Sequence, residues 1–452
     1  MADDVAPPQV KNRGWTVTFA AMIALLMLGA LYAWSVVSKA MGDDPNYDHW
    51  SEAEKIWPYS VCLIFFSVMT AVGGRIQDKR GPRIMISSGG VLVGLGLIIC
   101  GLSTNPLMWY VGFGALVGSG IGFAYSSGTP PSVKWFPASK TGLIAGLVVA
   151  GFGGGAIWVA PFLRAMINAY SIPTTMIVFG VMVTVVMVAM AQLVKAPPAG
   201  YVPVETAAKA GAAAKPKKVN VDYQPDVMIR TWQFKLMVAC FAFGGGAGLV
   251  FIGKMASIIT SFGFEAYSAI AVSVLALGNG LGRVFYGKLS DNFGRKPVII
   301  FALGLQAVLL VILSVWPIAD YTLSEAGKRV YAESSSTGVL VLVLVLGFLI
   351  GANYGANLAV FPAMTKDFFG LKNFGLNYGL VYQGWGIGGM IVSQVGAYLI
   401  AAQKSDGAEN IYLWAYYWVI ALLIVGVGLM FMMKTPKAPA QKAVEEATPA
   451  AS

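Results

Sequence analysis

The sequence predicts an all-α membrane protein with twelve transmembrane helices in two similar six-helix bundles. Three observations support this fold class: the composition, the length of the apolar segments and a motif that occurs twice. Of the 452 residues, 57% are hydrophobic and 12% are charged, whereas a soluble protein of this length needs a surface rich in Lys, Glu and Asp. The apolar segments run about 20 residues each, the length that crosses roughly 30 Å of hydrocarbon. A membrane β-barrel would instead show short segments of alternating polarity.

Twelve apolar segments are long enough to span a membrane. They cover residues 15–38, 56–74, 84–103, 107–128, 141–165, 172–194, 232–260, 266–287, 297–317, 337–360, 374–401 and 412–433. Between the sixth and the seventh lies a stretch rich in Ala, Pro and Lys, which is typical of a linker with room for a short interfacial helix. The chain therefore divides into an N-terminal tail 1–14, a first bundle 15–194, a linker 195–231, a second bundle 232–433 and a C-terminal tail 434–452.

The net charge of +10 is unevenly distributed along the chain. If both termini lie inside, most of the 31 Lys and Arg residues fall in inner loops or at the inner membrane edge. The outer loop 39–55 instead carries Asp43, Asp44, Asp48, Glu52 and Glu54. This is the positive-inside pattern of a multi-pass protein of the cytoplasmic membrane with both termini cytoplasmic. The basic excess therefore reports topology, and we expect a monomer in the lipid bilayer without a nucleic-acid partner.

Matching motifs occur at matching places in the two halves. GRIQDKRGPR (74–83) follows the second span, and GKLSDNFGRK (287–296) follows the eighth. KWFPASKTG (134–142) follows the fourth span, and AVFPAMTKD (359–367) follows the tenth. Paired signals of this kind indicate a duplication. We expect each copy of the first motif to form a charged turn.

This motif contains residue types suited to a conformational lock. Its first glycine permits close contact between helices, its aspartate caps a helix end or pairs with a cation, and its second glycine permits a tight reversal. Aspartate–arginine contacts across the inner face would hold one conformation, and their loss would release it. The residues that we assign to this lock are Gly74, Asp78, Gly81, Arg83, Gly287, Asp291, Gly294 and Arg295.

The twice-repeated pattern Gly-x-x-x-Asp-x-x-Gly, followed by basic residues, resembles the signature loop of the major facilitator superfamily. Within that superfamily, further runs are similar to the oxalate/formate antiporter family, which is related to the monocarboxylate transporters. These runs include LGALYAWSVV (28–37), FPASKTGLIAGLVVAGFGGGA (136–156), GRVFYGKLSDNFGRK (282–296) and KNFGLNYGLVYQGWGIGG (372–389). The resemblance implies two bundles around a central site that opens alternately to each side, and a small carboxylate as the substrate.

Arg283 stands out because it lies in an apolar segment shortly before the second motif. An ionised arginine in hydrocarbon costs at least about 2.5 kcal/mol, so it is normally retained where it faces a cavity and an anion. The alternative is a structural ion pair or a side chain that reaches the inner interface. In the families that the chain resembles, an arginine of this helix binds the substrate carboxylate, and Arg283 matches it in register. A guanidinium suits a carboxylate because it can donate two parallel hydrogen bonds.

Two neighbours extend this candidate site. Asn279 lies one helical turn before Arg283 on the same face, and we expect it to orient the substrate. Many proton-coupled monocarboxylate transporters have an aspartate there, and no Asp or Glu occurs deep in any predicted span, so a proton-coupled mechanism lacks its usual carrier. Lys254 is another cation within a span. It either completes the anion site, carries a proton or reaches the outer interface.

Aromatic and amide side chains in mid-helix are candidates for the walls of the site, with helix packing as the alternative role. A tyrosine offers an apolar face and one hydroxyl, which suits a small organic anion. The oxalate transporter of the family has a lysine in the eleventh span, whereas LNYGLVYQGWGIGGM contains no cation. Lactate, pyruvate or formate is therefore expected rather than oxalate. The wall candidates are Tyr32, Trp34, Tyr125, Asn353, Tyr354, Tyr382, Gln383 and Trp385.

The expected function is secondary transport of a small carboxylate by anion exchange. A bound anion would neutralise the buried arginine and ease the change of conformation. A proton-coupled symporter, an oxalate/formate-type dicarboxylate antiporter and a transporter-like sensor are the alternatives. We expect no enzyme, because no nucleophile–base constellation occurs, and neither a metal nor an organic cofactor.

Overall fold

The computed structural model describes residues 12–32, 34–42, 44–50, 52–198, 201, 203, 222–315, 321–323, 329–331, 333–405 and 410–436. Within this part of the chain, twelve helical segments are long and apolar enough to cross a membrane, as predicted. Six of them end before residue 195 and six begin after residue 231.

Two spans of the first half are interrupted helices. The first combines α1 (Gly14–Leu26), a 3₁₀ turn η1 (Met27–Leu31) and α2 (Trp34–Gly42). The fourth combines α5 (Pro106–Trp109), a π-helical stretch η3 (Tyr110–Val117) and α6 (Gly118–Lys134). The remaining spans are α3 (Glu52–Arg80), α4 (Pro82–Leu102), α7 (Thr141–Ala169) and α8 (Ile172–Leu193).

The second half consists mainly of long, continuous helices. A short helix, α9 (Pro225–Met228), precedes them. The strands β1 (Tyr321–Leu323) and β2 (Arg329–Tyr331) pair antiparallel between the ninth and tenth spans. The spans are α10 (Trp232–Ser261), α11 (Ser268–Phe293), α12 (Arg295–Val315), α13 (Glu333–Phe369), α14 (Phe374–Ser405) and α15 (Leu413–Met432).

Local sequence explains several helix starts. Ser171, Thr231 and Asn105 each accept a hydrogen bond from a backbone N–H of the following turn, at 3.3, 3.1 and 2.8 Å respectively. Capping of this kind satisfies a donor that has no partner inside the helix. Helices α4, α5 and α8 carry a proline in the first turn, where the missing N–H removes no helical hydrogen bond.

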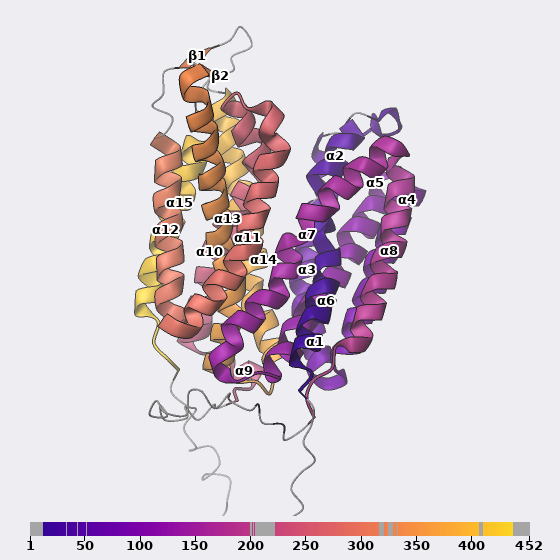
Figure 1. The fold of residues 1–452 in the computed structure, drawn as a ribbon, viewed down its shortest axis with the longest axis vertical. Helices are drawn as coiled ribbons and strands as arrows, with labels where there is room; N and C mark the ends of the chain where they lie inside the picture. Colours follow the sequence, from indigo (N-terminus) through magenta and orange to yellow (C-terminus); the bar gives the residue numbers. More distant parts are fainter. Residues whose placement is uncertain are drawn as a thin grey trace, which may run out of the picture.

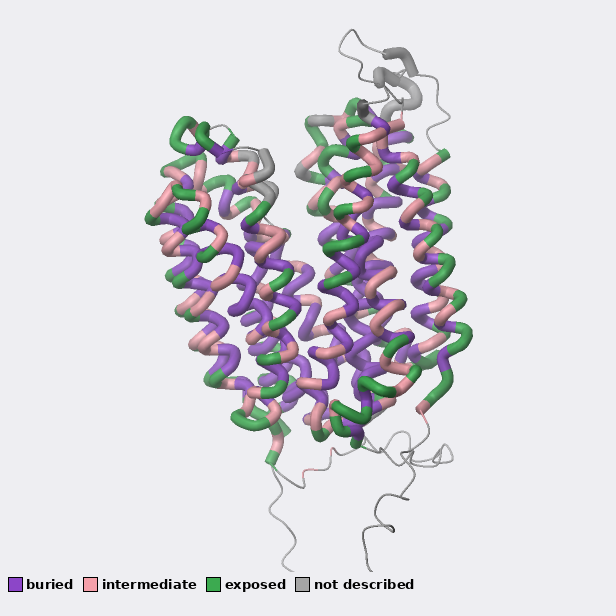
Figure 2. The backbone as a smooth tube through the Cα atoms, turned by 180° about the vertical axis from the view of Figure 1, so that it is seen from behind, coloured by how far each residue is buried: buried purple, intermediate pink, exposed green. Residues whose placement is uncertain are grey.

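The outward-facing surface of the helices is apolar. Figure 2 shows exposed residues along the length of these helices, and they include Val185 (62% exposed), Phe285 (60%) and Ile424 (61%). A continuous apolar surface of this kind is unfavourable in water and suits hydrocarbon surroundings. The polar contacts that position the site therefore lie inside the molecule.

The two halves lie side by side and approach each other most closely at one end (Figure 1). We call this the motif end, because it contains the turns at Gly81 and Gly294, and we call the opposite end the open end. Across the boundary between the halves, α3 packs against α14, and α11 packs against α7. These two helix pairs hold the motif end together.

Glycines make this close approach possible. A Cβ atom at Gly74 would lie 2.2 Å from the carbonyl oxygen of Gly375, and one at Gly287 would lie 2.3 Å from that of Gly142. Any side chain at these positions would force the helices apart. The close contact expected of the first motif glycine is present in both copies.

The charged turns predicted from the two motifs are shorter than expected. α3 continues to Arg80 and α11 to Phe293, so most of each motif is helical. The reversal is confined to Gly81, with φ +86°, and Gly294, with φ +92°, a backbone conformation that residues with a Cβ rarely adopt. The longer α11 also places Arg283 well inside this helix rather than near its end.

Candidate functional site

A cavity of about 530 Å³ lies between the two halves. Its walls come from η1, α2, α3 and α7 of the first half and from α10, α11 and α14 of the second. Several lining residues, among them Ser38, Tyr59 and Ile400, belong to helix segments that lead to the open end. The cavity therefore extends toward the open end, while the motif end is closed.

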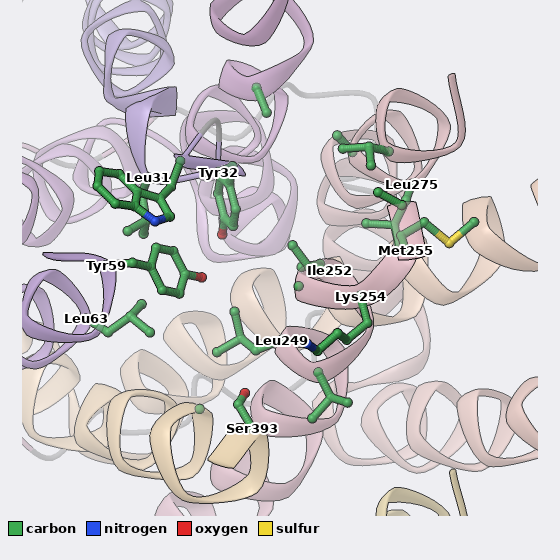
Figure 3. A pocket seen from close by; sticks show the side chains of 18 of the residues that line it. Leu31, Tyr32, Tyr59, Leu63, Leu249, Ile252, Lys254, Met255, Leu275 and Ser393 are labelled. Atoms are coloured by element: carbon green, nitrogen blue, oxygen red, sulfur yellow. The ribbon is translucent and has the colours of Figure 1, made fainter. Parts of the chain in front are cut away.

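Lys254 contributes the charge of this cavity. Among the described residues that line it, Lys254 is the one with a charged side chain. Its amine points into the space between the halves, as do the hydroxyls of Tyr32 and Tyr59 (Figure 3). This placement differs from a side chain that extends to the membrane interface, which the sequence left open.

Arg283 lies beneath the deepest part of the cavity. Three residues form this floor: Tyr32, Gly153 and Asn279 line the cavity, and each also adjoins Arg283. Arg283 itself is 0% exposed. The sequence placed Lys254 and Arg283 in one candidate site, but the floor separates the arginine from the cavity.

The guanidinium of Arg283 is only partly paired. Its Nε donates to Oδ1 of Asn279 at 3.0 Å, and its Nη1 donates to the carbonyl oxygen of Val149 in α7. Its Nη2 is buried and has no hydrogen-bond partner among the described residues. Asn279, which we expected to orient the substrate, thus orients the arginine. The guanidinium lies over the ring of Phe152, with 5.9 Å between its carbon Cζ and the ring centroid.

Tyrosines surround this arginine. They pack in an aromatic cluster, with ring centroids 5.1 Å apart for Tyr125 and Tyr382 and 4.9 Å apart for Tyr382 and Trp385. The indole Nε1 of Trp385 donates to the hydroxyl of Tyr354 at 2.9 Å. The hydroxyls of Tyr32, Tyr125, Tyr378 and Tyr382 are buried without a hydrogen bond of ordinary geometry. The phenols that lie near Arg283 are those of Tyr32, Tyr125, Tyr354 and Tyr382.

This arrangement is chemically suited to an anion. A buried donor without a partner costs about 1–3 kcal/mol, and more when it is charged. Among the described residues, the ion pairs found join Arg295 to Asp291 and Asp367, so no protein carboxylate neutralises Arg283. A small anion could accept hydrogen bonds from Nη2 and from the tyrosine hydroxyls, which can all act as donors.

The other predicted wall residues divide into two groups. Trp34 lines the cavity and packs on Trp109 and Phe113, with centroids 6.1 and 4.5 Å away. Asn353 lies inside the second half, where it accepts a hydrogen bond from the hydroxyl of Tyr286. The structure therefore places Trp34 at the cavity and Asn353 in a polar contact between α11 and α13.

Gln383 connects the two halves instead of lining the cavity. Its Oε1 accepts from the hydroxyl of Ser67 in α3 at 3.0 Å, and its Nε2 donates to the carbonyl oxygen of the same residue at 2.7 Å. It also donates to the carbonyl oxygen of Gly379 at 2.8 Å. Both polar atoms of this amide are thus occupied.

Sequence reasoning missed three aromatic residues of the site. Tyr59 lines the cavity from α3, and the ring of Phe152 lies against the guanidinium of Arg283. Tyr378 precedes Tyr382 by one helical turn, so its position on the same face of α14 could have been predicted. The other two positions depend on how helices from different parts of the chain pack.

The motif end is closed by two aspartates that each cap a helix of the opposite half. Asp78 in α3 accepts hydrogen bonds from the N–H groups of Gly375 and Leu376 at 3.1 and 3.0 Å. These groups lie in the first turn of α14, where unpaired donors and the helix dipole favour a negative charge.

Asp291 makes the equivalent contact in the other direction. It accepts from the N–H groups of Gly142 and Leu143, in the first turn of α7, at 2.8 and 2.9 Å. It also pairs with Arg295 of its own half, 2.6 Å away. The sequence predicted that the motif aspartates cap a helix end or pair with a cation at the inner face, and Asp291 does both. Its arginine partner lies in the same half, so the contacts of the two aspartates across the boundary run to backbone N–H groups. Arg83 likewise stays in its own half, where it donates to the carbonyl oxygen of Gln192 at 2.5 Å.

Comparison with known proteins identifies relatives along nearly the whole chain. The sequence model of the Major Facilitator Superfamily matches residues 14–324 and 255–452. The oxalate:formate antiporter of Oxalobacter formigenes is 24% identical over 406 residues, which is 87% of this chain and 89% of that protein. YhjX of Escherichia coli (strain K12), an uncharacterized MFS-type transporter, is 25% identical over 389 residues, covering 85% and 88%. Monocarboxylate transporter 11 of Mus musculus is 26% identical over 171 residues, covering 38% and 37%.

Solved structures share the fold. The proton:xylose symporter XylE superposes with a TM-score of 0.65 at 14% identity, covering 96% of this chain and 99% of that one. FucP in the outward conformation gives a TM-score of 0.58 at 16% identity, covering 92% and 100%. These neighbours are transporters rather than enzymes. Because the family model matches most of the chain, which contains twelve candidate spans among its described residues, the chain is a multi-pass membrane transporter and belongs to the major facilitator superfamily.

Proposed function

We propose that this chain exchanges small carboxylates across the cytoplasmic membrane, as a monomer, by alternating access around Arg283. The observation that carries the proposal is the state of this arginine, which is fully buried and has Nη2 without a hydrogen-bond partner among the described residues. A carboxylate that accepts from Nη2 would remove the cost of this unpaired donor. The names of two relatives, the oxalate:formate antiporter and monocarboxylate transporter 11, support a carboxylate substrate.

The groups that surround Arg283 favour a monocarboxylate over oxalate as the substrate. The guanidinium has one nitrogen without a hydrogen-bond partner among the described residues, and the hydroxyl donors near it are phenols. These can satisfy the two oxygens of one carboxylate. A second carboxylate would need a further cation, and residues 374–399 of α14 contain none. Formate, lactate and pyruvate are therefore the preferred candidates.

Exchange follows from the burial of Arg283. The arginine must stay between the halves while the two bundles, residues 15–194 and 232–433, rock about it. Without an anion, closing both ends around an unneutralised cation is costly. With an anion bound, the site is close to neutral. Return of the empty transporter is therefore slower than return of the loaded one, which makes transport an obligatory exchange.

The closed motif end corresponds to one state of this cycle. The positive-inside pattern of the sequence supports a cytoplasmic position for this end, so the cavity would face outward. Inward release then requires the contacts of Asp78 and Asp291 with the opposite half to break.

The test is flux of labelled formate, lactate, pyruvate and oxalate into proteoliposomes, with and without internal carboxylate and with and without a pH gradient. We expect uptake that requires internal anion in the wild type and is lost in Arg283→Gln. Arg164→Gln is the matched control, because Arg164 is exposed on α7 and undergoes the same chemical change. Uptake driven by a pH gradient alone would make the protein a proton symporter, and unchanged exchange in Arg283→Gln would refute the proposed role of this arginine.

A second variant perturbs the arginine without changing its charge. A Cβ atom at Gly153 would lie 2.8 Å from Nε and 2.9 Å from the guanidinium carbon of Arg283. At the neighbouring Gly154, a Cβ atom would meet nothing within 4 Å. We therefore expect Gly153→Ala to lower exchange at least about tenfold, because small displacements of a positioning group have large effects, while Gly154→Ala exchanges normally. Equal activity of the two variants would contradict a role for Arg283 at its present position.

A further inference from the structure

We infer that Lys254 forms an outer anion site, separate from Arg283, which holds a carboxylate before it reaches the buried arginine. This inference rests on the proposed function, because it takes the substrate to be a carboxylate that enters from the open end. It assigns the two cations to successive positions along one path instead of to a single site.

The charge distribution in the cavity favours an anion. None of the described residues that line it is an Asp or Glu, and Lys254 supplies a positive charge. Its side chain is half-buried and forms no hydrogen bond or ion pair with another described residue. A cation in a cleft with apolar walls raises the local concentration of anions.

Hydroxyl groups that can donate hydrogen bonds lie around the Lys254 amine. The hydroxyls of Tyr32 and Tyr59 point toward the same space as the Lys254 amine, and Ser393 lies on the wall formed by α14 (Figure 3). An ammonium group with two or three hydroxyls can satisfy both oxygens of a carboxylate. The walls between them are apolar, including Leu249 and Leu275, and suit a short alkyl group such as that of lactate.

The outer site and Arg283 are distinct in this conformation. Lys254 lines the cavity, whereas Arg283 is 0% exposed and lies below the floor of Tyr32, Gly153 and Asn279. An anion held at Lys254 can therefore reach Arg283 only when the floor rearranges.

Tyr32 belongs to both positions. It lines the cavity and lies near Arg283, and its hydroxyl makes no hydrogen bond of ordinary geometry among the described residues. It lies just after the 3₁₀ turn that interrupts the first span. Rotation of this side chain would pass a carboxylate from the amine to the guanidinium without leaving it unpaired.

The two sites should respond differently to salt. Charges in an open cavity are screened by dissolved ions, whereas buried charges are screened much less. The outer site should set how strongly KM for external carboxylate depends on salt. The inner site should set whether exchange takes place.

The first experiment measures exchange of labelled formate and lactate at low and high sodium chloride. We expect Lys254→Gln to raise KM for external substrate about tenfold, the loss of one charge-assisted hydrogen bond, with the maximal rate retained. We also expect its KM to vary less with salt. Lys254→Arg should restore both properties. Lys235→Gln is the matched control, because Lys235 is exposed on the same helix near the motif end.

The second experiment detects occupancy directly. Cys62, Cys100 and Cys240 are buried, so a thiol introduced by Lys254→Cys should be the one that reacts with water-soluble methanethiosulfonates. We expect a cationic reagent to restore a low KM and an anionic reagent to raise KM further. Protection is measured in a separate variant, Ser393→Cys, which keeps Lys254 and places the thiol on the same cavity wall. External formate or lactate should slow its reaction, and should do so equally when Arg283→Gln is also present.

The outcomes separate this inference from the proposed function. Loss of turnover in Lys254→Gln as complete as in Arg283→Gln would indicate one shared site and would overturn the inference. An unchanged KM and salt dependence in Lys254→Gln, or no protection of the thiol in Ser393→Cys, would also overturn it. Retained exchange in Arg283→Gln would instead refute the proposed role of Arg283 in transport, whatever the behaviour of the Lys254 variants.

Discussion

The two copies of the motif make the same contact across the boundary but are supported differently. In each, an aspartate accepts two N–H groups from the first turn of a helix in the opposite half. Asp291 is also paired with Arg295, whose Nε reaches Asp367 at 2.8 Å. The residue that follows the second glycine is Arg295 in this copy and Pro82 in the other. Asp78 therefore has no arginine at the equivalent position.

The difference extends along both helix pairs. On the α7–α11 side, Lys366 donates to the hydroxyl of Thr141 across the boundary, and Arg283 donates to the carbonyl oxygen of Val149. On the α3–α14 side, the deeper contact is the neutral pair of Ser67 and Gln383. The α7–α11 boundary thus has charged side chains along its length, and these include Arg283, the proposed ligand of the substrate.

This asymmetry suggests how an anion could release the lock. Arg283 and Asp291 lie on the same helix, α11, and both contact α7. An anion that draws the guanidinium away from Val149 would weaken the α7–α11 boundary at the level of the site. At the depth of Arg283, the described contacts of the α3–α14 boundary are the neutral ones between Ser67 and Gln383. We therefore expect this boundary to open only after the α7–α11 boundary has weakened.

Removal of Arg295 should have the largest effect on the motif end. Arg295→Gln leaves Asp291, whose side chain is 1% exposed, without its cation. Arg295 positions the carboxylate that accepts the N–H groups of Gly142 and Leu143 across the boundary. The pair itself lies within one half, so only the weakening of this contact with α7 changes the balance between the two states. We expect about 2 kcal/mol, which corresponds to a shift of roughly thirtyfold toward the state with an open motif end. The measurement is the distance between spin labels at Lys195 and Lys434, which are exposed on opposite halves at this end.

The control for this variant is Arg230→Gln, the same change at an exposed arginine just before α10. It should leave the distance between the labels as in the wild type. A distance in Arg295→Gln equal to that of the control would show that the charged network does not stabilise the closed end.

Substitution of Asp291 should destabilise the closed motif end more than substitution of Asp78. Asp78→Asn loses the charge at the start of α14, worth about 1 kcal/mol, because an amide oxygen still accepts one hydrogen bond. Asp291→Asn should cost about 2 kcal/mol, because it also weakens the pair with Arg295. The same label pair measures both variants. Equal opening by the two would mean that Arg295 contributes nothing to the contact of Asp291.

Pro82→Arg should make the two copies more alike. An arginine at this position could pair with Asp78 as Arg295 pairs with Asp291, but it would have no counterpart of Asp367, since the matching residue is Gly142. We expect a modest gain of about 0.5 kcal/mol for the closed motif end, typical of a partly exposed pair. Slower inward opening should be visible as a lower exchange rate. A wider label distance would show that the proline is needed for the start of α4.

The spans and motif glycines could be predicted because their signals are local. Hydrophobic length defines each span, and a glycine such as Gly81 or Gly294 is required wherever φ is positive. The position of Arg283 on an inward face could also be predicted, because an arginine in an apolar segment needs an interior environment.

The remaining features depend on contacts between distant parts of the chain. The partners of Asp78 and Asp291 are helix ends of the opposite half, far away in sequence. Gln383 and Tyr382 are adjacent in the sequence, yet one spans the boundary to Ser67 and the other belongs to the aromatic cluster. Which side chain faces which partner depends on how the helix is rotated about its axis. A helix that is apolar on all sides does not reveal this rotation in its sequence.

The second arginine of the lock assigned from the sequence, Arg83, should have the smallest effect. It donates to the carbonyl oxygen of Gln192 at the end of α8, within its own half, so its loss does not touch the boundary. Arg83→Gln should change the free energy difference between the closed and open motif end by less than about 0.5 kcal/mol, because Arg83 contacts neither aspartate nor the opposite half. The label distance and the exchange rate should therefore match the wild type. Opening as large as in Arg295→Gln would instead mean that both copies of the motif use their arginine alike, and the asymmetry between the two boundaries would no longer explain which one responds to substrate.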